Sequence, residues 1–288
     1  MKRRIFILLI FFVVPLLAGC VSNVKKDNEK INVMVSVLPQ MDFVKRIGGD
    51  KVDVEVMIGP GFNHATYEPT PGQIKDLSQM DLYVRIGHIA FEKSQMQRLQ
   101  DINPQMKVVD SSVGIKTRES QDEDEAGADP HIWMAPALVK IQAENIYQAL
   151  VDIRPEYKDY FEANKNNFLS DLDVLDKKLT EIFEPIKGQT VLVFHPAFGY
   201  LADAYGFAQE SIEEEGKDPS ITQLKEIIDK AKKDNIKVIF LQKQFSEKSA
   251  RVVADSIGGT VVAIDPLAPD YFSNMELIAQ SIKDNLTK

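Results

Sequence analysis

Cysteine is almost absent from this sequence of 288 residues, and no run long and apolar enough to span a membrane follows the first twenty residues. Cys20 is the single cysteine, so the chain cannot form an internal disulfide. The H-E-x-x-H, G-x-S-x-G and G-x-x-x-x-G-K-[ST] motifs are absent as well. The sequence therefore lacks the usual signatures of a zinc protease, a serine hydrolase and a P-loop nucleotidase, and we do not expect an enzyme.

Positive charge is also scarce. The chain has 34 lysine and arginine residues against 43 aspartate and glutamate residues, which gives a formal net charge of −9. Lys2, Arg3 and Arg4 lie in a segment that we expect to be removed, and its loss makes the remaining chain more acidic. Because nucleic-acid phosphates need a basic partner surface, this balance argues against binding to nucleic acid.

The N-terminal segment has the pattern of a lipoprotein signal peptide. Three basic residues precede a short apolar run at 5–17, and the small residues Ala18 and Gly19 precede Cys20. The run is too short for a comfortable membrane span of about 20 residues. We expect cleavage after residue 19, lipid such as palmitate on Cys20, and a polar tether at 20–30. This pattern predicts an extracytoplasmic protein anchored to the cell membrane or to the periplasmic face of a membrane.

Short apolar and β-branched runs recur along the rest of the chain. They predict strands at 31–37, 52–58, 82–86, 107–109, 191–194, 237–241 and 260–264. Most of these runs are nearly continuous in apolar residues, which is typical of strands buried on both faces of a parallel sheet. Helix-start signals lie between them at Thr70-Pro71, Ser220 and Ser246. This alternation predicts an α/β fold with parallel sheets flanked by helices.

One long amphipathic helix is predicted at 155–184, between the two groups of strands. Its apolar residues recur at steps of three, four and once seven, at Tyr157, Phe161, Phe168, Leu172, Leu175, Leu179 and Ile182. Such a helix is about 45 Å long, so we interpret it as a rigid spine between two lobes rather than a surface helix of one large domain. The expected division is an N-terminal lobe at 31–154, the spine at 155–187 and a C-terminal lobe at 188–288.

Four histidines and one aspartate lie where ligands of parallel sheets are found. His64, His88 and His195 follow predicted strands, His131 precedes a helix, and Asp265 directly follows the last strand. In open parallel sheets, ligands bind beyond the carboxyl ends of the strands. Three imidazoles and a carboxylate converging there form a four-coordinate site of the type that zinc prefers, whereas manganese prefers more oxygen ligands.

Several motifs occur in an order that resembles a known family. They are Asp129-Pro130-His131-Ile132-Trp133-Met134-Ala135-Pro136, Phe194-His195-Pro196-Ala197-Phe198-Gly199-Tyr200, Ser211-Ile212-Glu213 and Ile264-Asp265-Pro266-Leu267. They resemble motifs of the zinc- and manganese-binding solute-binding lipoproteins of ABC transporters. The resemblance covers the chain from about residue 31 to its end, and it implies a two-lobed α/β fold with a long linking helix.

The resemblance implies metal ligands at His131, His195 and Asp265, with histidine at the third position as in the zinc-selective members. The first ligand departs from the family pattern Asp-Pro-His-x-Tyr-Glu-Pro, because residues 63–69 read Asn-His-Ala-Thr-Tyr-Glu-Pro and place Ala65 in the ligand column. His88, after a strand and a glycine, is the favoured first ligand. His64 is the alternative, or an additional ligand.

The resemblance also implies a function. The protein would capture Zn²⁺ between its lobes, as a monomer, and deliver it to a membrane permease with its ATPase. A manganese-binding homologue, a zinc-dependent hydrolase and an adhesin lipoprotein are the alternatives. A hydrolytic zinc keeps one coordination position open for water, and a site with four protein ligands offers none.

Overall fold

The computed structural model describes residues 30–64, 67–119, 127–213 and 219–287 and contains two parallel four-stranded sheets. The sheet of the N-terminal lobe consists of β1 (Ile31–Val37), β2 (Val52–Ile58), β3 (Leu82–Arg85) and β4 (Lys107–Asp110), in the order β2-β1-β3-β4. Its register pairs Val33 of β1 with Leu82 of β3. β1 is almost wholly buried, as its continuous apolar sequence predicts.

The C-terminal lobe repeats the same strand order. Its sheet consists of β5 (Thr190–Val193), β6 (Ala208–Ser211), β7 (Val238–Gln242) and β8 (Thr260–Ile264), in the order β6-β5-β7-β8. The predicted α/β class is therefore confirmed. The sequence analysis missed β6, because this short edge strand reads Ala-Gln-Glu-Ser and carries no apolar run.

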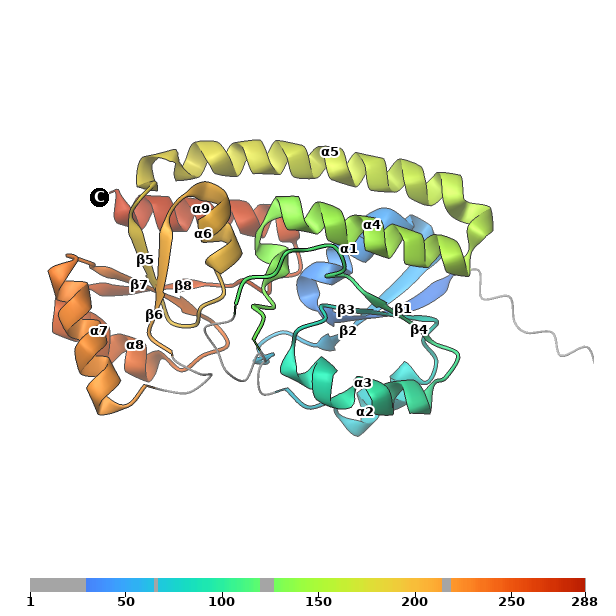
Figure 1. The fold of residues 1–288 in the computed structure, drawn as a ribbon, viewed down its shortest axis with the longest axis horizontal. Coiled ribbons are helices and arrows are strands. Elements are labelled where there is room, and N and C mark those ends of the chain that lie inside the picture. The colour runs from blue at the N-terminus through green and yellow to red at the C-terminus, as the bar shows by residue number, and fades with distance from the viewer. Residues whose placement is uncertain (1–29, 65–66, 120–126, 214–218, 288) are drawn as a thin grey trace, which may run out of the picture.

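Helices cover both faces of each sheet (Figure 1). In the N-terminal lobe, α1 (Leu38–Gly48) and α4 (Pro136–Ile153) lie on one face, and α2 (Pro71–Leu77) and α3 (Ala90–Ile102) lie on the other. In the C-terminal lobe, α6 (Gly199–Tyr205) and α9 (Tyr271–Leu286) lie on the first side, opposite α7 (Ile221–Lys233) and α8 (Glu247–Ile257). The predicted capping residues open α2, α7 and α8, where each hydroxyl accepts a backbone N–H bond.

The long helix α5 (Lys158–Phe183) extends across both lobes along one side of the molecule (Figure 1). Its 26 residues correspond to about 39 Å. The predicted range was longer at both ends, where the structure has short 3₁₀ turns at Pro155–Tyr157 and Glu184–Ile186. Pro185 lacks the backbone N–H that continued α-helical bonding needs at the C-terminal end, whereas Pro155 stands at the start, where proline is compatible with the first turn.

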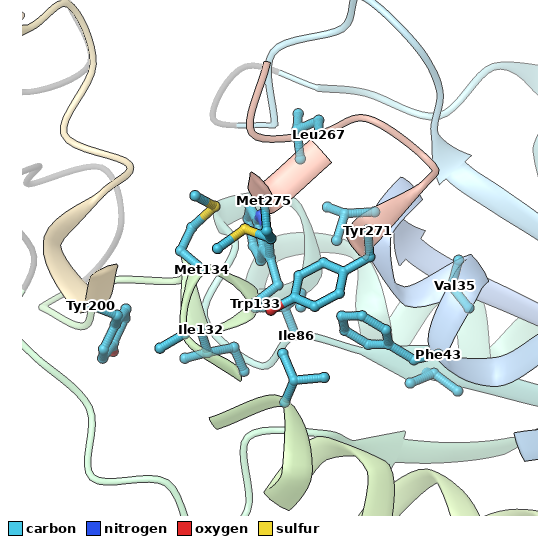
Figure 2. Packing of buried hydrophobic residues seen from close by; sticks show 14 of the residues in the cluster. Val35, Phe43, Ile86, Ile132, Trp133, Met134, Tyr200, Leu267, Tyr271 and Met275 are labelled. Atoms are coloured by element: carbon cyan, nitrogen blue, oxygen red, sulfur yellow. The ribbon is translucent and has the colours of Figure 1, made fainter. Parts of the chain in front are cut away.

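The two lobes share one hydrophobic core. The main cluster of buried residues runs from β1 through α4 and α5 to β5 and α9, while a smaller cluster lies beneath α7 and α8. Phe43 of α1 meets Tyr271 of α9 edge to face, with ring centroids 4.9 Å apart (Figure 2). The Arg46 guanidinium lies 4.1 Å from the ring centroid of Phe272. Contacts between the lobes are therefore made by packed side chains as well as by α5.

Across the residues with described coordinates, no helix combines the length and the apolar character that crossing a membrane requires. The signal peptide expected at 1–19, Cys20 and nearly all of the tether expected at 20–30 lie outside the described residues.

Candidate metal site

Three of the four histidines lie together between the lobes. His64 stands in the loop after β2, His131 precedes the 3₁₀ turn Ile132–Met134, and His195 lies two residues after β5. One ligand nitrogen from each lies within 4.8 Å of the others, and all three residues are buried. The Nε2 atoms of His131 and His195 are 3.2 Å apart. Each of the two lobes thus contributes imidazole to one small volume.

Two buried carboxylates orient two of these rings. His131 Nδ1 lies 2.8 Å from Asp129 Oδ1, and His195 Nδ1 lies 2.7 Å from Glu213 Oε2. A carboxylate at Nδ1 holds the proton there and leaves the Nε2 lone pair for a ligand. The two Nε2 atoms lie at hydrogen-bond distance, 3.2 Å, and a metal ion that bound both would take the place of a proton between them. The arrangement is the one found for histidines that bind metal ions.

The sequence analysis did not assign roles to these carboxylates. Asp129 lies two residues before His131 in the same motif, so this short spacing could have indicated the contact between the two side chains. Glu213 follows β6, a strand that the apolar pattern did not reveal, and it is 18 residues from His195 along the chain. Only the pairing of β5 with β6 brings Glu213 to His195.

Backbone contacts keep His195 in place. The backbone N–H of His195 donates to Gln242 Oε1 at 3.1 Å, and Gln242 Nε2 donates to the His195 carbonyl at 2.6 Å. Gln242 ends β7 and is fully buried. The ring of Phe245 stacks on the imidazole, with centroids 4.8 Å apart. His195 is thus held through its main chain, its Nδ1 atom and one ring face.

The cavity beside the histidines is small. Its volume is about 10 Å³, which suits a species the size of one water molecule or a bare ion. It is lined by His64, His131, Trp133, His195, Ala197, Gln242, Gln244, Phe245, Pro266 and Leu267. Trp133 Nε1 donates to the Pro266 carbonyl at 2.9 Å, which joins the lobes at the cavity wall. Figure 2 shows Trp133 among the packed residues of the core between Met134 and Tyr271.

Asp265 is not part of the group of three histidines. Its Oδ1 accepts hydrogen bonds from Gln244 Nε2 at 2.9 Å and from the backbone N–H of Leu267 at 3.0 Å. Lys243 Nζ lies 3.8 Å from Oδ2. The side chain of Asp265 lines a separate pocket with Asn274, although the next two residues, Pro266 and Leu267, line the histidine cavity.

His88, which the sequence analysis preferred to His64, also lies outside the group. It follows β3 and is half-buried, and burial lowers its pKa while the charge of Asp110 acts in the opposite direction. Gly87 before it has a φ of +97°, and a Cβ there would lie 2.5 Å from an Asp110 oxygen. The structure instead brings His64 to the site from the loop after β2. Which of His64 and His88 binds a metal ion stays a prediction, and the loop geometry that places His64 is not visible in the sequence pattern.

A fold of two parallel-sheet lobes with buried histidines between them defines a two-lobed metal-binding solute-binding protein. The chain belongs to the family described as zinc-uptake complex component A, periplasmic, whose model matches residues 33–285. This is a family of substrate-binding proteins of metal ABC transporters, and its members are not enzymes. The resemblance seen in the motifs is therefore confirmed.

Relatives with zinc and with manganese in their names are both similar to this chain. The high-affinity zinc uptake system protein ZnuA of Bacillus subtilis is 28% identical over 88% of this chain and 85% of its own length. The manganese ABC transporter substrate-binding lipoprotein PsaA of Streptococcus anginosus is 27% identical over the full length of both. A crystal structure of ZnuA is 40% identical with a TM-score of 0.85, covering 89% of this chain and 99% of that one.

Proposed function

We propose that this protein captures Zn²⁺ between its two lobes and delivers it to the membrane permease and ATPase of an ABC transporter. The observation that carries the proposal is the pair of Nε2 atoms 3.2 Å apart, each on a ring whose Nδ1 faces a buried carboxylate. A donor set dominated by imidazole favours zinc over manganese, which prefers oxygen ligands.

The proposed ligands are His64, His131 and His195, with Asp265 as the fourth. Asp265 belongs to the same turn as Pro266 and Leu267, which line the histidine cavity. A small shift of this turn would bring its carboxylate to the ion. His88 is the rival of His64 as the first ligand. Four protein ligands complete a tetrahedral zinc site and leave no position for a reactive water.

The proposed cellular setting follows from the N-terminal pattern and from the family. Lipid on Cys20 would hold the protein at the extracytoplasmic face of a membrane, and the tether at 20–30 would let the folded part reach the permease. The name of the PsaA relative contains the word lipoprotein, which supports this setting. We propose a monomer with lobes at 31–154 and 188–288, because each chain carries one complete site.

Calorimetry of the demetallated protein with Zn²⁺ and with Mn²⁺ tests the proposal. We expect tight Zn²⁺ binding with one ion per chain and weaker Mn²⁺ binding. His64→Ala should weaken Zn²⁺ binding by more than about 100-fold, since loss of even an outer-shell partner typically costs 10–100-fold. His88→Ala is the matched control and should bind like the wild type.

Three outcomes would contradict the proposal in different ways. Failure of the wild-type protein to bind either ion would remove the function itself. Loss of binding in His88→Ala together with normal binding in His64→Ala would keep the function and reverse the choice of ligand. Tighter binding of Mn²⁺ than of Zn²⁺ would replace zinc by manganese as the cargo.

A further inference from the structure

A contact between the lobes leads directly to His131. The segment after β4 leaves the N-terminal lobe and passes beside α6 of the C-terminal lobe (Figure 1). There Arg118 forms an ion pair through Nη1 with the Asp203 carboxylate on α6. The Arg118 Nε atom lies 3.8 Å from Asp129 Oδ2. A single guanidinium is therefore shared between a carboxylate of each lobe.

The two oxygens of Asp129 have different partners. Oδ1 accepts the backbone N–H of His131 at 2.9 Å and lies 2.8 Å from its Nδ1 atom. Oδ2 faces Arg118. The Asp129 side chain is only 8% exposed, whereas that of Asp203 is 61% exposed. Because a buried carboxylate is costly without a positive neighbour, Arg118 supplies a favourable charge beside the Asp129 side chain that orients the His131 ring.

Backbone bonds and close packing support the same contact. Tyr200 of α6 accepts the backbone N–H of Arg118 at 3.0 Å and donates to the Asp129 carbonyl at 2.9 Å. Burial raises the pKa of Tyr200 to about 12, so its hydroxyl keeps the proton that it donates. A Cβ at Gly199 would lie 2.8 Å from Arg118 Nε and 3.0 Å from Asp129 Oδ2. Because Gly199 has no side chain, α6 can lie this close to Arg118 and Asp129.

We propose that Arg118 is a positioning residue that couples contact between the lobes to the orientation of His131, and so sets how long the metal ion stays bound. The inference rests on the proposed function. Movement of α6 away from the N-terminal lobe removes Asp203 and Tyr200 from Arg118 and Asp129 together. Asp129 then holds the His131 ring less firmly, and the ion dissociates faster.

The test measures the rate at which Zn²⁺ passes from the loaded protein to an excess of a coloured chelator. The variants are Arg118→Gln, Asp203→Asn and the double variant. Arg118→Gln should release the ion about 10–100-fold faster, the usual cost of losing an outer-shell partner. Asp203→Asn should release it a few-fold faster, since an exposed ion pair contributes modestly. The double variant should match Arg118→Gln, because Asp203 acts through Arg118.

Arg251→Gln is the matched control, because Arg251 pairs with Glu247 in an exposed ion pair on α8. It should release Zn²⁺ at the wild-type rate. The thermal unfolding midpoint of the demetallated protein should be the same for Asp203→Asn and the wild type, which separates positioning from a general loss of stability.

The inference is overturned if Arg118→Gln releases Zn²⁺ at the wild-type rate. It is also overturned if the effect of Asp203→Asn persists in full on the Arg118→Gln background, since the two residues then act separately. Absence of Zn²⁺ binding by the wild type contradicts the proposed function instead, so the two failures are distinguishable.

Discussion

At the scale of single residues, the histidines depend on neighbours that do not themselves face the ion site. Glu213 is 4% exposed and meets His195 Nδ1, and Asp129 does the same for His131. An imidazole that is free to rotate or to change tautomer binds an ion less well, because the ordering must then occur on binding. These carboxylates would therefore fix the orientation of both rings before the proposed ion binds.

Glu213→Gln should reduce the affinity for Zn²⁺ by about 10–100-fold. The amide can still accept from Nδ1–H, but it lacks the negative charge that makes His195 a more basic ligand. Glu210→Gln is the control, because Glu210 lies on the same strand and its carboxylate pairs with Lys230 at the surface. Competition against a chelator of known affinity measures the Zn²⁺ affinity of both variants. Equal Zn²⁺ affinities of the two variants would show that the charge on Glu213 has no role in Zn²⁺ binding.

At the scale of elements, α5 is held by one apolar face. The buried residues of this face are Phe161, Lys165, Phe168, Leu172, Leu175, Leu179 and Phe183. Five of them belong to the apolar pattern from which the helix was predicted, while Tyr157 and Ile182 are only partly buried. Lys165 is the polar member, and its ammonium pairs with Glu144 and lies 4.2 Å from the Tyr147 ring centroid.

Leu172→Ala should lower the free energy of unfolding by about 2–5 kcal/mol, because Leu172 is fully buried and truncation leaves a cavity beneath α5. Val174 is two residues away on the same helix and is 68% exposed. Val174→Ala should therefore change the free energy of unfolding by less than about 0.5 kcal/mol. Urea denaturation of the demetallated variants checks both values. Similar losses in the two variants would contradict the burial pattern.

At the scale of the whole molecule, the shared core limits how far the lobes can separate. Phe43 and Arg46 of α1 contact Tyr271 and Phe272 of α9, and α5 packs against helices of both lobes. Separation of the lobes by a wide hinge would expose these side chains to water. We therefore expect the ion to enter and leave through a small movement near the site.

Small-angle X-ray scattering with and without Zn²⁺ tests this expectation. The radius of gyration should change by less than about 1 Å, as in pre-organised binding proteins whose backbone moves little. The Zn²⁺-loaded protein treated with excess chelator should return to the starting value. A reversible decrease of several ångströms on binding would instead indicate a wide hinge.

The sequence by itself was enough to predict the α/β class, the long helix and seven of the eight strands that the described residues form. It also singled out His131 and His195, which the structure brings together, and their role as ligands stays a prediction. These features depend on local periodicity and on short motifs, which are visible in any stretch of the chain. The signal-peptide pattern ending at Cys20 is local in the same sense, and lipid attachment there stays a prediction.

Only the tertiary structure decided which further residues join the two histidines. It brought His64 next to them and left His88 outside the group. It also placed Glu213 against His195 and joined Asp203 to Asp129 through Arg118. It also held Asp265 on Gln244, outside the histidine group. Each of these contacts depends on how loops and an inconspicuous edge strand bring distant parts of the chain together. Local sequence patterns carry little information about such geometry, because packing between the lobes determines it.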